Sequence, residues 1–153
     1  MTILCVKRPL GPSLKTSLCA VTIAITLSLS ACSSTSKTLY SEIGGQAKVE
    51  QITDNFIEEI GYNKHIVRYF EKTDISRFRE KLNEHICMVA DGPCEYTGDS
   101  MENVHAGMDI NENHFNLTVD LLINAMTKAD IPHSTQNKLL ARFAPMRSEI
   151  AFK

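Results

Sequence analysis

The sequence predicts an all-α fold, and three observations support that class. Apolar residues recur every three or four positions through several segments, which is the spacing that places them on one face of a helix. No segment of the sequence alternates apolar and polar residues with the period of two that a half-buried strand requires. Residues that commonly begin helices, such as Asp74 and Asn111, stand directly before periodic segments.

The first expected helices follow one another closely. Residues 40–45 form a short helical turn that ends in the double glycine Gly44-Gly45. Residues 46–60 form a helix whose end we place at Gly61, because glycine commonly ends helices. A short helical turn follows at residues 66–70. The apolar stripe of the second helix is Val49, Ile52, Phe56 and Ile60.

Three further helices complete the expected fold. One runs from Asp74 to about residue 90, where Asp91-Gly92-Pro93 stops it, and another from Asn111 to about residue 128. The last opens at Pro132 or Ser134 and is kinked by Pro145. Their inward stripes are Ile75, Phe78, Leu82, Ile86 and Val89, then Phe115, Val119, Leu122 and Met126, then Leu139, Leu140, Phe143 and Ile150.

Residues 1–31 read as an export signal rather than as part of the fold. A basic start precedes the apolar run 17–29, which is too short for a comfortable membrane span. The sequence Leu29-Ser30-Ala31-Cys32 then resembles the lipobox of bacterial lipoproteins, where lipid is attached to the cysteine. Ser33 resembles the outer-membrane sorting pattern, so we expect a protein anchored at Cys32 in the cell envelope, facing the periplasm. The alternative is a plain signal peptide with an incidental cysteine.

The expected mature chain consists of a polar tether, residues 32–38, and one domain, residues 39–153. Cys87 and Cys94 are its remaining cysteines, and they are either bridged or free thiols. Removal of Lys7, Arg8 and Lys15 lowers the Lys plus Arg count from 16 to 13 against 18 Asp plus Glu, a net charge of −5. This balance argues against a nucleic-acid partner.

One histidine stands among soft apolar residues after a Gly-Pro break. Met101, Val104, His105 and Met108 have helical spacing and share one expected face. A metal on one ring nitrogen and the Met101 carbonyl on the other would satisfy such a histidine. Histidine is a proximal ligand of haem iron, and the apolar neighbours suit a porphyrin face. The alternative is a helix histidine that binds no metal.

These residues also carry a family resemblance. The segment Tyr96-Thr97-Gly98 followed by Met101 and Val104-His105 resembles the proximal region of the group 1 truncated haemoglobins. The similarity runs without a gap from about residue 40 to residue 150, through Leu39-Tyr40, Ile43-Gly44-Gly45, Tyr69-Phe70, Ser76-Arg77, Gly92-Pro93, His114-Phe115 and Ala144-Pro145.

The resemblance implies two helix pairs stacked two-over-two around haem, with His105 as the proximal iron ligand. The absence of a Cys-x-x-Cys-His sequence indicates non-covalent haem b. Phe70, Ile110 and Phe115 match haem-lining positions, beside the apolar wall of Met101, Val104 and Met108. Thr73, Arg77, Lys81 and Tyr96 match positions that meet the haem propionates, or they belong to a solvated helix face.

The distal side departs from the family pattern. Many members place tyrosine and glutamine there, but this chain has Ile57, Phe78 and Leu82, none of which donates a hydrogen bond. This places tight retention of dioxygen in doubt. Some members use a histidine or lysine at the position of Lys81 as a sixth iron ligand, so Lys81 is a candidate for both roles.

Three functions follow from these observations. The first is a haem protein that reversibly binds oxygen, CO or NO through an apolar distal pocket. The second is a haem redox enzyme, such as a nitric-oxide dioxygenase with an external reductase, and the third is a structural helical lipoprotein without cofactor.

The other histidines are weaker candidates for a functional role. His85 could pair with Cys87 or His114 in a metal site, although the spacing typical of a zinc site is not complete. We expect His65 and His133 to be surface residues.

Overall fold

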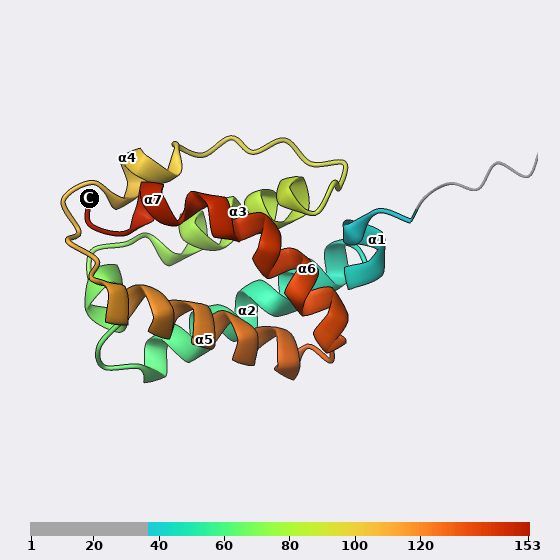
Figure 1. Cartoon of the computed structure of the whole chain (residues 1–153), viewed down its shortest axis with the longest axis horizontal. Helices are drawn as coiled ribbons and strands as arrows, with labels where there is room; N and C mark the ends of the chain where they lie inside the picture. Colours follow the sequence, from blue (N-terminus) through green and yellow to red (C-terminus); the bar gives the residue numbers. More distant parts are fainter. Residues whose placement is uncertain (1–36) are drawn as a thin grey trace, which may run out of the picture. The chain divides into compact units, whose positions relative to one another are not determined.

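The computed structural model describes residues 37–153, and this part of the chain is all helix and loop, without a strand (Figure 1). The predicted all-α class is therefore confirmed. The expected signal peptide, the lipid anchor at Cys32 and the start of the tether lie outside the described residues. Within residues 37–153, none of the helices combines the length and the apolar character that crossing a membrane requires.

Nine helical segments follow in order along the described residues. They are α1 (Leu39–Ile43), α2 (Gln46–Tyr62), the 3-10 turn η1 (Val67–Phe70), α3 (Ile75–Val89), α4 (Met101–His105), α5 (Glu112–Lys128), α6 (His133–Phe143), the 3-10 turn η2 (Ala144–Met146) and α7 (Arg147–Ile150).

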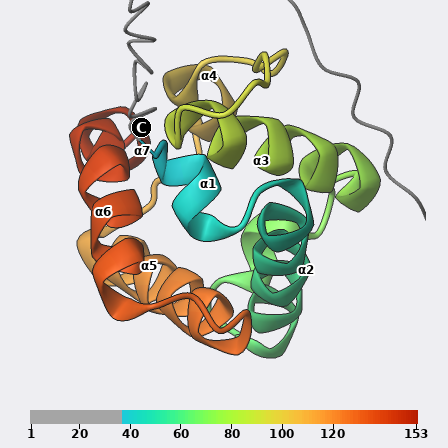
Figure 2. The ribbon, with the colours of Figure 1, turned by 90° about the vertical axis from the view of Figure 1, so that its right-hand side faces the viewer.

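The four long helices form two pairs, as Figures 1 and 2 show: α2 with α3, and α5 with α6. The pairs meet chiefly where α2 packs along α5. The expected stripe of α2 is buried there, and all of its members are at most 7% exposed. Burying side chains of this size contributes roughly 1.5–3 kcal/mol each, so this contact holds the scaffold. The arrangement is the two-over-two stack that was expected.

Side-chain caps are present at the two helix starts that the sequence predicted. The carboxylate of Asp74 accepts a hydrogen bond from the backbone N–H of Arg77, and the amide oxygen of Asn111 accepts one from that of His114. Each cap satisfies a backbone donor that the first helical turn leaves without a partner. Both predicted helix starts are confirmed.

Three expectations of detail were wrong. Gly61 does not end α2, which continues through Tyr62 to Asn63, because an exposed glycine in the last turn costs little against continued backbone hydrogen bonding. Met108 lies outside the His105 helix, since α4 ends at His105 and the chain turns at Gly107 with φ +75°. Ile75 is 44% exposed rather than inward.

The final helix breaks at Pro145, as predicted. The chain passes from α6 through η2 into α7, because proline cannot donate to the helical hydrogen-bond ladder. The break returns the C-terminus to α4: the backbone N–H of Asp109 donates to the carbonyl of Lys153 at 3.0 Å. Lys153 also pairs with Glu102 of α4, with Nζ 3.1 Å from Oε1.

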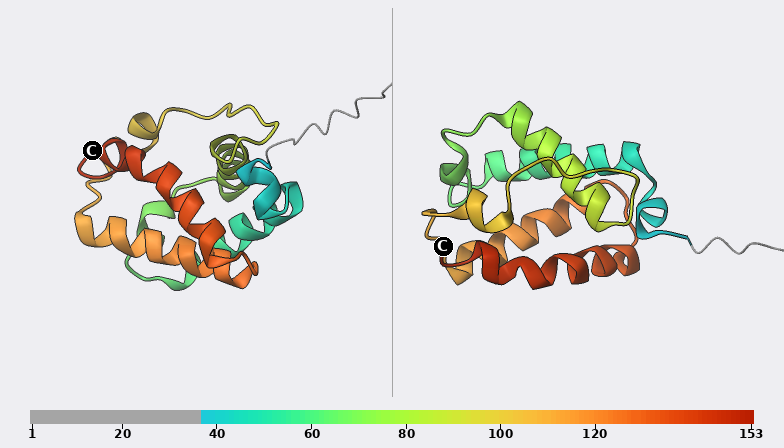
Figure 3. Two further views of the ribbon diagram at one scale, coloured as in Figure 1. Left: turned by 45° about the vertical axis from the view of Figure 1, so that its right-hand side comes forward. Right: turned by 90° about the horizontal axis from the view of Figure 1, so that it is seen from above.

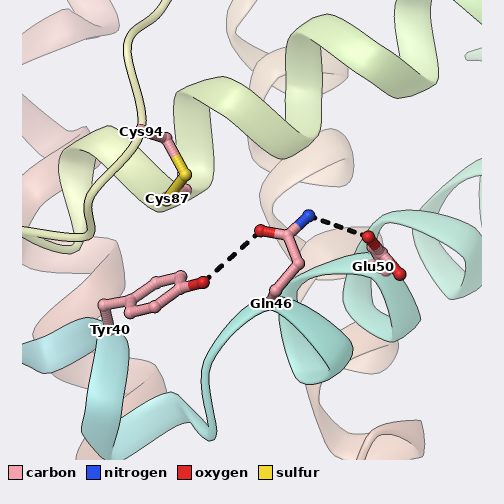
Figure 4. Close-up of a disulfide and its surroundings, with 5 residues drawn as sticks. All are labelled: Tyr40, Gln46, Glu50, Cys87 and Cys94. Carbon is pink, nitrogen blue, oxygen red and sulfur yellow. Dashed lines mark hydrogen bonds between the residues drawn. A yellow bond between two sulfur atoms is a disulfide. The ribbon is translucent and has the colours of Figure 1, made fainter.

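Residues 91–100 form an extended connection between α3 and α4, visible in Figure 3 as the loop that crosses α3. A disulfide between Cys87 and Cys94 fixes its start, with the Cα atoms 5.8 Å apart, within the usual range (Figure 4). The bridged alternative is thus the one observed. Gly92 is required at this corner, because an added Cβ would stand 2.5 Å from the Cys87 sulfur.

Candidate haem site

His105 occupies the last position of the short helix α4, and its ring is oriented by the backbone. Ser100 caps the helix by accepting a hydrogen bond from the backbone N–H of Asn103. The Nδ1 atom of His105 lies 2.7 Å from the carbonyl oxygen of Met101, the contact expected from the sequence. With Nδ1–H donating there, Nε2 carries the lone pair and makes no hydrogen bond to any described residue.

The charge state of His105 also suits a metal ligand. Burial lowers the pKa of His105, and the hydrogen bond to the Met101 carbonyl opposes that shift. A neutral imidazole whose second nitrogen is held by a carbonyl is the usual form of a histidine ligand. The arrangement therefore presents Nε2 for coordination without the cost of first removing a proton.

The expected apolar neighbours of His105 differ in exposure. Met101 is half-buried, Val104 is 39% exposed, and Ile110 is buried, with its carbonyl bonded to the N–H of Phe152. Phe115 is half-buried at the start of α5, and the Arg147 guanidinium lies 5.6 Å from its ring centre. These side chains give the region around His105 an apolar character.

An apolar hollow of about 240 Å³ brings together two of the predicted distal residues, Ile57 and Phe78, with the predicted haem-lining residue Phe70. The rings of Phe70 and Phe78 meet with their centres 5.0 Å apart. The rest of the lining comes from Ile60, Gly61, Val67, Glu71 and Ile75, and the one polar side chain among these, that of Glu71, offers carboxyl oxygens that accept hydrogen bonds. Leu82 does not line this hollow. It is half-buried and packs against two groups of buried apolar residues, one that includes Ile52 and Met126 and one that includes Phe56 and Leu121.

The four residues predicted to meet the haem propionates differ in the partners that they already have. Arg77 forms no ion pair with another described residue, so its guanidinium is available to a carboxylate. Thr73 is half-buried and directly precedes Asp74, the N-cap of the same helix. The Tyr96 hydroxyl donates to the carbonyl of Asp99 at 2.7 Å, and burial is the main cause that raises the pKa of Tyr96.

Lys81, the fourth member, is already bound by protein groups. Its Nζ lies 2.7 Å from Glu80, 2.9 Å from Glu84 and 2.6 Å from the Thr97 hydroxyl. The hydrogen bonds that Lys81 donates to Glu80 and then to Glu84 raise the pKa of Lys81. The backbone N–H of Thr97, followed by Lys81, lowers the pKa of Glu84 to about 2. Lys81 therefore stands as an ammonium neutralised by two carboxylates.

His85 is more buried in this region than the sequence led us to expect. It is 7% exposed, and its ring packs 4.9 Å from that of Tyr96 and 5.6 Å from that of Phe143. Burial, and then the proximity of His105, lowers the pKa of His85, so a neutral ring is favoured. Its spacing of seven from Phe78 placed it on the inner face of α3, which was the available signal.

The alternative metal site around His85 is not formed. Cys87 is used in the disulfide, and His114 instead lies 2.8 Å from the Tyr69 hydroxyl, at the start of α5. Among residues 37–153 there is no cluster of three or more side chains of the types that hold a metal ion. A single imidazole beside apolar surface, with a cation nearby, fits haem better than a bare ion, because the porphyrin supplies the remaining iron ligands.

Comparison with known proteins gives a consistent answer. Residues 38–152 match the family described as bacterial-like globin. The group 1 truncated hemoglobin GlbN of Mycolicibacterium paratuberculosis is 33% identical over 113 residues, covering 74% of this chain and 83% of that protein. The GlbN of Nostoc sp. is 29% identical over 116 residues, covering 76% of this chain and 98% of that protein.

Solved structures agree at the level of the fold. The truncated hemoglobin of Tetrahymena pyriformis in its Fe(III) form matches with a TM-score of 0.73 and 20% identity, over 76% of this chain and 99% of that one. The 2/2 hemoglobin of Synechococcus sp. PCC 7002, described with covalently attached heme, matches with a TM-score of 0.70 and 16% identity, over the same shares.

Proposed function

Because the chain belongs to the bacterial-like globin family, we propose that it binds a diatomic gas reversibly on haem b, as a carrier-type truncated haemoglobin. The family supports a haem globin with gas ligands, and the proposal adds the reversible, carrier-type use of that ligand. The observation that supports this choice is the apolar hollow of Ile57, Phe70 and Phe78, which offers no hydrogen-bond donor to bound gas.

Each part of the site has a role in this proposal. His105, with its ring fixed by the Met101 carbonyl, would hold the iron through Nε2. Phe70, Phe115 and Ile110 would exclude water from the porphyrin, and Arg77 would pair with a propionate. Bound haem supplies the iron position at which a small diatomic ligand binds.

Removal of the proximal ligand tests the haem assignment. His105→Ala should lose the Soret band, or regain it only with added imidazole, while His114→Ala should keep both haem content and spectrum. Wild-type haem content and spectrum in His105→Ala would contradict the proposal. A purified wild-type protein that takes up no haem at all would instead favour the structural, cofactor-free alternative.

Adding a donor to the hollow tests the carrier-type assignment. Ile57→Tyr places a hydroxyl at a lining position, and Ile57→Phe is the matched control without it. A hydrogen bond to bound dioxygen is worth about 1–3 kcal/mol in a site that excludes water, so dioxygen should leave Ile57→Tyr roughly ten- to a hundredfold more slowly than Ile57→Phe. CO dissociation should change little. Slow dioxygen release from the wild type would mean that another group already donates.

The enzymatic alternative makes a different prediction. A nitric-oxide dioxygenase depends on retained dioxygen, which the hollow does not favour. Wild-type protein supplied with a reductase should therefore consume nitric oxide no faster than His105→Ala. Sustained consumption that requires His105 would replace the carrier assignment with the redox one.

We also propose attachment to the cell envelope through lipid on Cys32, as an outer-membrane lipoprotein facing the periplasm. The support is in the sequence alone, where Leu29-Ser30-Ala31-Cys32 follows the apolar run 17–29. Cys32→Ala should move the protein from the membrane fraction to the soluble fraction. Unchanged sedimentation with membranes would show that another feature is the anchor.

A further inference from the structure

The two sulfur atoms of the disulfide differ in their access to solvent. Cys87 is 0% exposed on α3, whereas Cys94 is half-buried in the connection of residues 91–100. A surface pocket of about 370 Å³ has Cys94 in its lining, and Cys87 is not part of that lining. A reagent that enters this pocket, which we call the disulfide pocket, therefore meets Cys94 and not Cys87.

The disulfide pocket carries more negative than positive charge. Its lining consists of Gln46, Glu50, Ser76, Arg79, Glu80, Asn83, Glu84 and Cys94. The one lining cation, Arg79, is paired with Asp54. Lys81 pairs with both Glu80 and Glu84. Glu50 accepts a hydrogen bond from Gln46 at 2.8 Å, beside the disulfide in Figure 4, and has no ion-pair partner among the described residues. Four carboxylates thus meet two cations, so the pocket attracts positive charge and repels anions.

Beyond the proposed function, we propose that the disulfide pocket is a thiol-exchange site that admits a thiol with positive charge beside its sulfur and directs it to Cys94. The thiolate attacks Cys94 Sγ, the bond to Cys87 breaks, and Cys87 leaves as a thiolate that takes a proton from water. A second thiolate of the same reactant attacks the reactant sulfur of this mixed disulfide and frees Cys94, which is protonated in turn. Two reactant thiols become one disulfide, and their two electrons reduce the protein bridge.

The burial of Cys87 explains why the reactant has to be held in place. Cys87 lies near the C-terminal end of α3, where burial and the helix carbonyls both disfavour a thiolate. A sulfur that leaves reluctantly makes exchange slow. A thiol without affinity for the pocket should therefore react slowly, whereas a thiol held there by its charge stays close to Cys94 and reacts faster.

Reduction at this site would loosen one segment of the protein. The connection of residues 91–100 leads from α3 to α4 and His105. Its contacts that remain after reduction include the hydrogen bond from Thr97 to Glu84 and the ion pair between Asp91 and Arg142. The thiol-exchange site therefore sets how firmly the segment before His105 is held.

A trapping experiment identifies the attacked sulfur. The purified protein is treated briefly with excess cysteamine, quenched with acid, unfolded, alkylated at low pH and digested. Peptide masses should show the cysteamine adduct on Cys94 and the alkyl group on Cys87, with at least tenfold more of this pattern than of the reverse. Protein unfolded in urea is the control and should give both patterns. An adduct on Cys87, or equal amounts of both patterns in the folded protein, would overturn the proposal.

The charge preference is measured with two small thiols. The rate of bridge reduction per thiolate is compared between cysteamine, a cation, and 2-mercaptoethanesulfonate, an anion. Glu50→Gln removes the unpaired carboxylate of the lining, and Glu149→Gln, at an exposed position of α7 outside the lining, is the control with the same change in net charge. Glu50→Gln should lower the cation-to-anion ratio by about two- to fivefold at low ionic strength, and high salt should remove the difference. Glu149→Gln should keep the wild-type ratio. The same ratio in Glu50→Gln and wild type would contradict selection by charge.

Two end-blocked tripeptides, Lys-Cys-Lys and Glu-Cys-Glu, identify the source of the thiol. A larger rate ratio for the peptides than for the small thiols would assign the site to a cysteine on a basic protein surface, and an equal ratio would assign it to a small cationic thiol. No preference for the basic member of either pair would refute the proposal. None of these measurements uses the haem, so their outcome is separate from that of the proposed function.

Discussion

Two regions of this protein are held by different physics. The α2–α5 contact consists of side chains such as Ile52 and Met126, both fully buried, and its stability is spread over many apolar neighbours. The connection of residues 91–100 has no fully buried residue and is held by the disulfide, the Glu84–Thr97 hydrogen bonds and a close approach at Gly92. The stability of the α2–α5 scaffold is therefore shared among many contacts, whereas the position of the segment that leads to His105 depends on a few.

The largest expected effect comes from breaking the scaffold. Ile52→Ala removes three buried carbons from a position with 0% exposure, and such a change lowers the free energy of unfolding by about 2–5 kcal/mol. Ile75→Ala is the control, because Ile75 is 44% exposed and should cost well under half as much. Urea unfolding of the purified proteins measures both. Equal losses would mean that burial does not distinguish the two sites.

The next effect comes from opening the connection. Replacing the bridge by Cys87→Ala with Cys94→Ser should lower the free energy of unfolding by about 2 kcal/mol, since the closed loop is short. Hydrogen exchange should rise in residues 91–105 and stay unchanged in α2 and α5. Reduced wild-type protein is the control and should show the same local pattern. A rise spread evenly over all helices would contradict the contrast between the regions.

The same contrast explains what the sequence could predict. Periodicity reports burial along a helix, so the all-α class, the buried stripe of α2 and the caps at Asp74 and Asn111 were predicted correctly. Residues 91–100 follow no helical period: Gly92, Cys94, Tyr96 and Gly98 turn inward at every second position. The partners of this segment, such as Cys87 and Glu84 on α3 and Arg142 on α6, depend on the path of the chain, which no local pattern reports.

The candidate site divides in the same way. The hydrogen bond from His105 to Met101 is local to one turn and was expected from spacing alone. The burial of His85 depends on Tyr96 and Phe143, which come from two other parts of the chain, and it was missed. The engagement of Lys81 was missed for the same reason, because Thr97 reaches it only after the disulfide turns the chain back along α3.

A pH series separates the polar contacts from the apolar scaffold. The pKa of Glu84 is lowered from 4.5 to about 2, so its carboxylate stabilises the folded state fully above pH 4.5 and loses this effect as the pH falls through 2. Glu84→Gln lacks this contribution. The difference in urea midpoint between wild type and Glu84→Gln should stay constant above pH 5 and shrink between pH 4.5 and 2. A difference that grows on acidification would mean that the sign is wrong.

The smallest expected effect comes from removing a polar group from the scaffold. We expect the scaffold to tolerate this loss, whereas the connection of residues 91–100 should not. Thr53 is fully buried in α2, and its hydroxyl has no hydrogen-bond partner among the described residues. A buried hydroxyl without a partner costs free energy, and valine has nearly the same shape without the oxygen. Thr53→Val should therefore leave the free energy of unfolding unchanged or raise it by up to about 1 kcal/mol.

Thr53→Ser is the matched control, because it keeps the oxygen and removes the methyl group. Loss of a buried methyl group should lower the free energy of unfolding by about 1 kcal/mol, so the two variants should move in opposite directions. In the connection, by contrast, Thr97→Val removes a hydroxyl that contacts both Lys81 and Glu84 and should destabilise the local structure. Destabilisation by Thr53→Val as large as that by Thr53→Ser would show that the hydroxyl has a partner, and that polar contacts support the scaffold too.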